Sequence, residues 1–194
     1  PEPPKLSDKS ISQAWQAKPE LGQKSTTEAA MDMAMTLTSS PGPHKLIITG
    51  HTQNALPDHN GGPGKMSDAS IEASHSLGEG RAYSSLADVV EAVRTMRQEG
   101  KPFSIDIELR SFVGGDAKGN PTKADYAGTQ WDGNTDKGCT GRCRGEVFKV
   151  RLHSNMTDKE LKDIGDMARQ DGEAKMQEGR TASDKINAGG GGGK

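Results

Sequence analysis

The stretch from Lys45 to Thr52 reads KLIITGHT, a short apolar strand that runs directly into a polar Gly-His-Thr tripeptide. A second segment, SLGEGRAYSSLADVVEAV at 76–93, places an Arg-Ala pair (Arg81 and Ala82) at the start of an amphipathic helix. A strand that ends in a polar loop, followed by an arginine at a helix start, brings backbone N–H groups and a cation into one crevice. These two segments predict a ligand-binding arrangement without evident catalytic groups.

Hydrophobic periodicity predicts the other elements. From Ala30 to Leu37, apolar residues recur three or four positions apart, which is one face of a helix, and the Ser- and Pro-rich residues 39–43 end it. Residues 103–110 and 148–152 alternate between apolar and polar side chains, as half-buried strands do. A capping box from Thr157 to Glu160 predicts the start of a last helix.

The predicted order is helix, strand, helix, strand, strand, helix, with two long Gly-rich inserts at 53–76 and 113–145. This order indicates an α/β fold, an α+β sandwich in which the helices pack on one face of a single sheet. We expect an extended N-terminal arm over 1–26, one domain over 27–170 and a flexible Gly-rich tail over 171–194.

Composition excludes several functional classes. The formal net charge is −2, whereas nucleic-acid-binding domains usually carry a concentrated basic face. No apolar run approaches the roughly 18 residues that a transmembrane helix needs. The chain begins at Pro1 rather than Met, which we interpret as a processed form that is exported or targeted to an organelle.

The cysteines and histidines do not form a recognisable metal site. Cys139 and Cys143 are three residues apart and no second pair completes a zinc site, so a small disulfide loop and two free thiols stay open as alternatives, with a metal or redox role behind them. The histidines are scattered without metal-ligand spacing. We therefore expect no metal and no cofactor.

The stretch AAMDMAMTLTSSPGPHKLIITGHT at 29–52 resembles the opening of an OmpA-like domain. That family continues with a loop and a Leu-Ser-x-x-Arg-Ala motif, and Leu77-Gly-Glu-Gly-Arg81-Ala82 stands in that place here. The next strand, the Gly-rich stretch that ends near Asp136 and the closing strand EVFKVRL follow the order of the family. The resemblance covers roughly residues 27–153 and implies an OmpA-like β-α-β-α-β arrangement.

OmpA-like domains hold a diaminopimelate-bearing peptide of peptidoglycan without chemistry. An acid pairs with the amine of the ligand, an arginine pairs with its carboxylate, and loop N–H groups complete the pocket. Arg81 matches the arginine of the family, but Gln53 stands where the family has an aspartate, so the nearest candidate acid is Asp58. The ligand-binding residues that the resemblance implies are Gly50, His51, Thr52, Gln53, Asp58, Arg81 and Arg144.

The leading hypothesis is a non-catalytic OmpA-like module with a degenerate pocket, acting as an accessory or scaffolding subunit of a membrane-associated or envelope complex. The second hypothesis is a peptidoglycan-binding anchor in the periplasm. A third is a secreted enzyme or toxin with an unrecognised site. For Arg81 the alternative to ligand binding is a local ion pair with Glu79.

Overall fold

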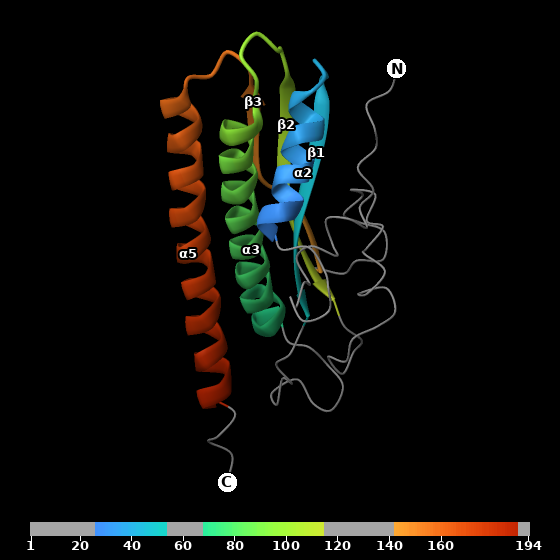
Figure 1. Ribbon diagram of the computed structural model, residues 1–194. Helices are drawn as coiled ribbons and strands as arrows, with labels where there is room; N and C mark the ends of the chain where they lie inside the picture. The colour runs from blue at the N-terminus through green and yellow to red at the C-terminus, as the bar shows by residue number, and fades with distance from the viewer. Residues whose placement is uncertain (1–25, 54–67, 115–141, 190–194) are drawn as a thin grey trace.

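The computed structural model describes residues 26–53, 68–114 and 142–189. Within them the chain forms, in order, α2 (Thr26–Thr38), β1 (His44–Gln53), α3 (Asp68–Met96), β2 (Ser104–Gly114), β3 (Cys143–His153) and α5 (Asp158–Gly189). The three strands form one mixed sheet of order β1-β2-β3, and the described helices lie on one side of it (Figure 1). The α+β class predicted from the sequence is therefore confirmed.

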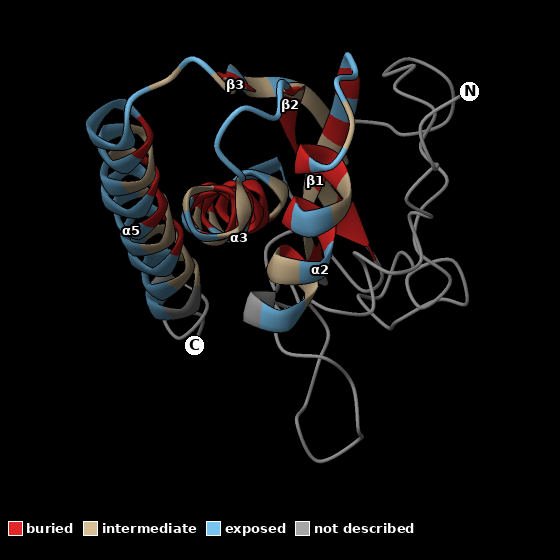
Figure 2. Cartoon of the chain, turned by 45° about the horizontal axis from the view of Figure 1, so that its top comes forward, coloured by how far each residue is buried: buried red, intermediate tan, exposed pale blue. Residues whose placement is uncertain are grey.

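The sheet combines a parallel and an antiparallel pairing. β1 and β2 are parallel, and α3 makes the crossover between them. β3 returns antiparallel to β2. In the helical layer α3 lies in the middle, between α2 and α5 (Figure 2).

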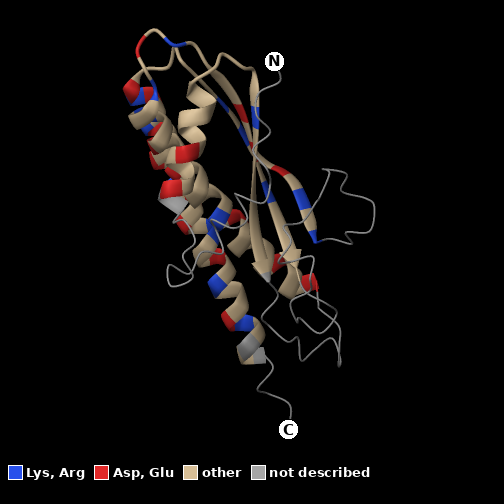
Figure 3. Cartoon of the chain, turned by 45° about the vertical axis from the view of Figure 1, so that its right-hand side comes forward, with Lys and Arg blue, Asp and Glu red and all other residues tan. Residues whose placement is uncertain are grey.

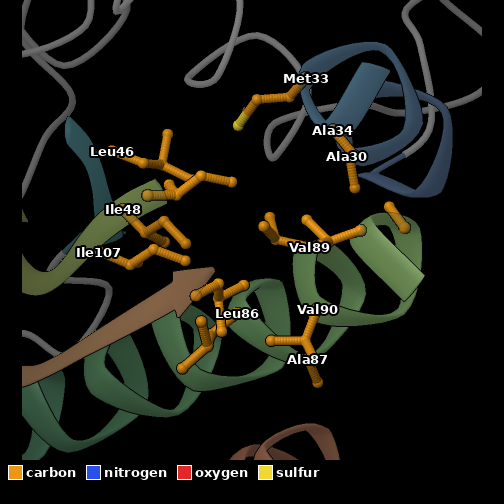
Figure 4. Close-up of a cluster of buried hydrophobic side chains, with 14 of the residues drawn as sticks. Ala30, Met33, Ala34, Leu46, Ile48, Leu86, Ala87, Val89, Val90 and Ile107 are labelled. Carbon is orange, nitrogen blue, oxygen red and sulfur yellow. The ribbon is translucent and has the colours of Figure 1, made fainter. Parts of the chain in front are cut away.

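The core lies between the sheet and the helical layer. Alternate residues of each strand face the helices, because successive side chains of a strand point to opposite faces. Ile48 of β1 and Ile107 of β2 are buried there, on the side of the sheet that faces Leu86 of α3 (Figure 4). Removal of these apolar side chains from water is the main driving force for the packing of the two layers. Among the described residues the hydrophobic cluster comprises Ala30, Met33, Ala34, Leu37, Leu46, Ile48, Ala82, Tyr83, Leu86, Ala87, Val89, Val90, Ala92, Val93, Phe103, Ile105, Ile107, Leu109, Leu152, Leu161 and Ala168.

The Gly-His-Thr tripeptide lies within β1, and the prediction that it forms a loop was wrong. Gly50 pairs with Ser111 and Thr52 pairs with Val113. β2 continues to Gly114, beyond the predicted strand end at Arg110, so β1 has a hydrogen-bonding partner along its whole length. The candidate pocket is therefore built on a strand.

α3 begins at Asp68, so residues 68–76 of the first predicted insert are helical. Hydrophobic periodicity did not predict these first turns of α3, because the residues that they bury are small or polar. Ser70, Ala73 and Ser74 are all buried. At the second predicted insert, 113–145, both ends belong to strands, since β2 ends at Gly114 and β3 begins at Cys143.

α5 continues to Gly189, so the predicted flexible tail from residue 171 was wrong for all of its described part. The capping box at its start is confirmed: the Glu160 amide donates to the Thr157 hydroxyl, and the Thr157 amide donates to the Glu160 carboxylate, both at 3.1 Å. Glycines every seven residues lower the intrinsic helix propensity of α5. Packing against α3 compensates, because Gly172 and Gly179 lie at close approaches of the two helices.

Glycines permit the close approaches of α3 to its neighbours. A Cβ atom on Gly78 would lie 2.7 Å from the Ser111 hydroxyl and 3.0 Å from the Gly50 carbonyl oxygen. A Cβ atom on Gly172 of α5 would lie 3.2 Å from the carbonyl oxygen of Gly80. Only glycine allows backbones to approach so closely, and α3 is in backbone contact with β1 through one glycine and with α5 through another.

We expect Gly78→Ala to lower the free energy of unfolding by about 1–3 kcal/mol, because the added methyl group overpacks the junction of α3 with β1. Gly165→Ala is the matched control, since its Cβ atom would lie 3.6 Å from Val90 Cγ1, an ordinary contact. That substitution should raise the free energy of unfolding by up to ~1 kcal/mol through helix propensity alone. Urea unfolding measures both, and a Gly78→Ala protein as stable as the wild type would contradict the packing argument.

Candidate functional site

The structure brings the two sequence motifs together. The end of β1, Gly50–Thr52, lies against the Gly78 turn of α3, and Arg81 is one turn further along the helix. The guanidinium NH1 of Arg81 donates to the carbonyl oxygen of His51 at 2.8 Å. The prediction that the Gly-His-Thr tripeptide and the arginine share one site therefore agrees with the described geometry, whereas the alternative pairing of Arg81 with Glu79 is not the contact that forms.

An aromatic pair joins β1 and β2 at this end of the sheet. The imidazole of His51 and the ring of Phe112 make an edge-to-face contact with centroids 5.1 Å apart. Both residues point to the sheet face opposite the helices: they are a cross-strand pair, and His51 lies an odd number of residues from Ile48, which faces the helices. The exposed Arg81 guanidinium therefore reaches the His51 carbonyl oxygen from the helical side of the sheet, whereas the two rings lie on the opposite face.

A carboxylate network occupies the other side of α3. The side chain of Glu79 is only 5% exposed, and its Oε1 accepts a hydrogen bond from Arg144 NH1 of β3 at 3.0 Å. Its Oε2 lies 3.3 Å from Lys175 Nζ of α5. Arg144 also binds Glu72, with NH2 at 2.5 Å from Oε2. One buried carboxylate therefore links α3, β3 and α5.

A β-bulge gives Arg144 this position. The register of β2 with β3 shifts between Leu109 and Ser111, so that Ser111 lies opposite Arg144. The shift is two residues and keeps each side chain on its face of the sheet, so Arg144, opposite the helix-facing Ser111, points toward α3. The predicted ligand-binding Arg144 is thus turned into the fold.

The charges shift the pKa values of the network in opposite directions. The hydrogen bond from Arg144 lowers the pKa of Glu72 below its ordinary value, outweighing the partial burial that raises it. The Glu72 hydrogen bond raises the pKa of Arg144. Burial lowers the pKa of Lys175, but the attraction of Glu79 and Glu178 outweighs that effect, so the pKa of Lys175 lies above its usual range. Each of these shifts in pKa favours the charged form of Glu72, Arg144 and Lys175.

A second polar pair lies deeper, between α3 and β2. The His75 Nδ1 lies 2.8 Å from the Ser111 hydroxyl, and both residues are fully buried. A serine beside a histidine is the geometry of an activated nucleophile, but a substrate has no access to a hydroxyl without exposed surface. The neighbouring Thr52 hydroxyl is also buried, and no described residue hydrogen-bonds to it. We interpret these groups as polar packing of the strand–helix junction.

Several predicted residues are not placed. Gln53 is the last residue of β1 and pairs with Gly114, but its side chain is not described. Asp58 and Cys139 lie outside the described residues, as does the predicted arm over 1–25. Cys143 opens β3 opposite Phe112. The Cys139–Cys143 disulfide and a role for Asp58 stay predictions.

Sequence reasoning missed Glu72, Glu79 and Lys175 as members of the site. Two acids seven residues apart lie on the same face of a helix, which is the one signal that the sequence offered. Their cationic partners are remote: Arg144 is 72 residues from Glu72 along the chain. The basic residues of β3 have acidic partners as well, because Lys149 binds Glu146 and Arg151 binds Asp106. Basic and acidic residues are interspersed over the described elements (Figure 3).

Among residues 26–53, 68–114 and 142–189, no group of three or more His, Cys, Asp or Glu side chains is arranged to hold a metal ion. No described helix is both long and apolar enough to cross a membrane. Comparisons with protein-family models, curated proteins and solved structures find no match for this chain.

The lowered pKa of Glu72 predicts a pH dependence of stability. A carboxyl group whose pKa is depressed on folding stabilises the fold above its unfolded pKa of about 4.3, and this contribution is lost as the pH falls through the lower folded value. We expect Glu72→Gln to lose stability less steeply than the wild type below about pH 4.3, measured by urea unfolding at a series of pH values. Glu173→Gln, at an exposed glutamate without an ion pair in the described structure, should follow the wild-type curve. Superimposable curves for Glu72→Gln and the wild type would rule out a contribution of Glu72 ionisation to the pH dependence of stability.

Proposed function

We propose that the chain is a non-catalytic OmpA-like module that serves as an accessory or scaffolding subunit of a larger membrane-associated or envelope complex. The observation that carries this proposal is the use of Arg144 within the fold. Its guanidinium lies between the carboxylates of Glu72 and Glu79. A ligand carboxylate would have to displace both acids, and the buried Glu79 would then lose one of its two cationic partners, which is costly for a buried charge.

The neighbouring positions support the same proposal. One N–H of Arg81 is used by the His51 carbonyl. Gln53 stands where the resemblance expects an aspartate, and a neutral amide does not provide the negative charge that a ligand ammonium group needs. A pocket whose charges are satisfied internally is consistent with a module that retains the fold and contributes surface to an assembly.

A peptidoglycan-binding anchor is the second candidate, and one observation favours it. Arg81 is exposed, and its remaining guanidinium N–H groups have no hydrogen-bond partner among the described residues. An arginine in this state can bind a carboxylate in bidentate geometry. The two candidates therefore differ in whether Arg81 has an external ligand.

Sedimentation with purified peptidoglycan separates them. Under the scaffold proposal the wild-type protein shows no saturable binding, because no acid of the described residues pairs with Arg81. Under the anchor proposal binding is saturable, and Arg81→Ala weakens it by about tenfold or more through loss of a charge-assisted pair. Arg180→Ala, at an exposed arginine of α5 remote in sequence from the motifs, is the matched control and should leave binding unchanged.

Native fractionation tests the scaffold proposal directly. The protein should co-purify with other subunits at a fixed stoichiometry through two orthogonal separations. A monodisperse monomer in mild native extracts would contradict it, whatever the result with peptidoglycan.

A further inference from the structure

The two halves of α5 are held in different ways. The first half contributes Leu161 and Ala168, both fully buried, to the hydrophobic core. Its start is fixed by Asp158, whose two carboxylate oxygens accept hydrogen bonds from Nε and NH2 of Arg94 at 3.2 and 2.8 Å. Apolar burial and a bidentate ion pair both act here, so this half is firmly attached to α3.

The second half, residues 172–189, runs along the N-terminal half of α3 (Figure 1). None of its described side chains belongs to the hydrophobic core. The fully packed positions are Gly172 and Gly179, where a Cβ atom would lie 3.2 Å from the Gly80 carbonyl oxygen and 2.7 Å from Leu77 Cγ. Close backbone contact adds van der Waals attraction but removes little apolar surface from water. In addition, the Ser183 hydroxyl is buried without a hydrogen-bond partner among the described residues, which opposes this packing.

One ion pair joins the second half of α5 to the rest of the described structure: Lys175 with Glu79. Both partners have a second partner nearby. Glu79 also binds Arg144, and Lys175 Nζ lies 3.6 Å from Glu178 of its own helix. If the pair separates, neither charge is left alone, so separation avoids the large penalty of an unpaired buried charge.

We propose that residues 172–189 form a latch that opens and closes on α3 as a unit, while residues 158–168 stay attached. The Lys175–Glu79 pair is the catch of this latch. Opening exposes the Leu77–Gly80 surface of α3 and the Glu79 carboxylate. Segments with few buried apolar contacts are the ones that open locally in native proteins, because their opening free energy is far below that of global unfolding.

Native-state amide hydrogen exchange tests this proposal on the full chain. Amides of 176–186 should exchange faster than those of 161–170 in the wild type. Lys175→Met keeps the aliphatic stem and removes the charge, and it should raise exchange in 176–186 by about tenfold without changing 161–170. Lys159→Met is the matched control, since Lys159 pairs with Asp163 within α5 and holds no other element.

A second variant tests whether residues 172–189 open as a unit, by changing their packing rather than their charge. Gly179→Ala should also raise exchange selectively in 176–186, because its methyl group meets Leu77 and the Ala73 carbonyl oxygen. Gly165→Ala should slow exchange along α5 or leave it unchanged, because its added methyl group meets no close contact. Circular dichroism verifies that each variant retains the fold.

A double-mutant cycle tests whether Glu79→Gln and Lys175→Met act by removing the same ion pair or by two independent effects. In the double variant Glu79→Gln/Lys175→Met, the amides of 176–186 should exchange no faster than in the faster single variant. The same ion pair is lost in the double variant and in both single variants. Equal protection of both halves of α5 in the wild type would overturn the latch. So would a uniform rise along the whole helix in Lys175→Met, or multiplicative effects of the two substitutions.

Discussion

The close backbone approach of α3 to its neighbours is the constraint on which the rest of the structure depends. Gly78 places the helix directly against β1, and Gly80 places it directly against α5. Because α3 is also the crossover between the parallel strands, its position sets the registration of the sheet with the helical layer. A side chain at Gly78 would separate the helical layer from the sheet, whose apolar residues must meet to exclude water.

The same central helix distributes the charges of the candidate site. Its face toward α5 and β3 carries Glu72 and Glu79, which bind Arg144. Its opposite side carries Arg81, which reaches the His51 carbonyl. Arg144 thus stabilises the fold, although the resemblance to OmpA-like domains implies a ligand-binding role for it. This use of Arg144 is the physical basis for proposing a scaffolding role.

Periodicity predicted the elements that bury apolar side chains and failed for those that bury small ones. The face from Ala30 to Leu37 and the alternating residues of β2 were recognisable, because large apolar side chains recur at the spacing of the helix or strand. The first turns of α3 and the second half of α5 pack through Ser, Ala and Gly, which resemble loop composition. Their helical state depends on a partner helix at close range.

The candidate site also combines contacts that the sequence predicted with contacts that it did not predict. Residues 50–52 and Arg81 were predicted to meet, and the strand–helix connection brings them together because both motifs lie near the same end of the sheet. By itself, the sequence determined the α+β class, the number and order of the described helices and strands, and the capping of α5, since these follow from side-chain spacing along short segments. The tertiary structure alone decided that Gly50–Thr52 is strand, that α5 continues past residue 171, and that Arg144 binds Glu72 and Glu79. Those outcomes depend on contacts between residues far apart in the chain, which no local pattern encodes.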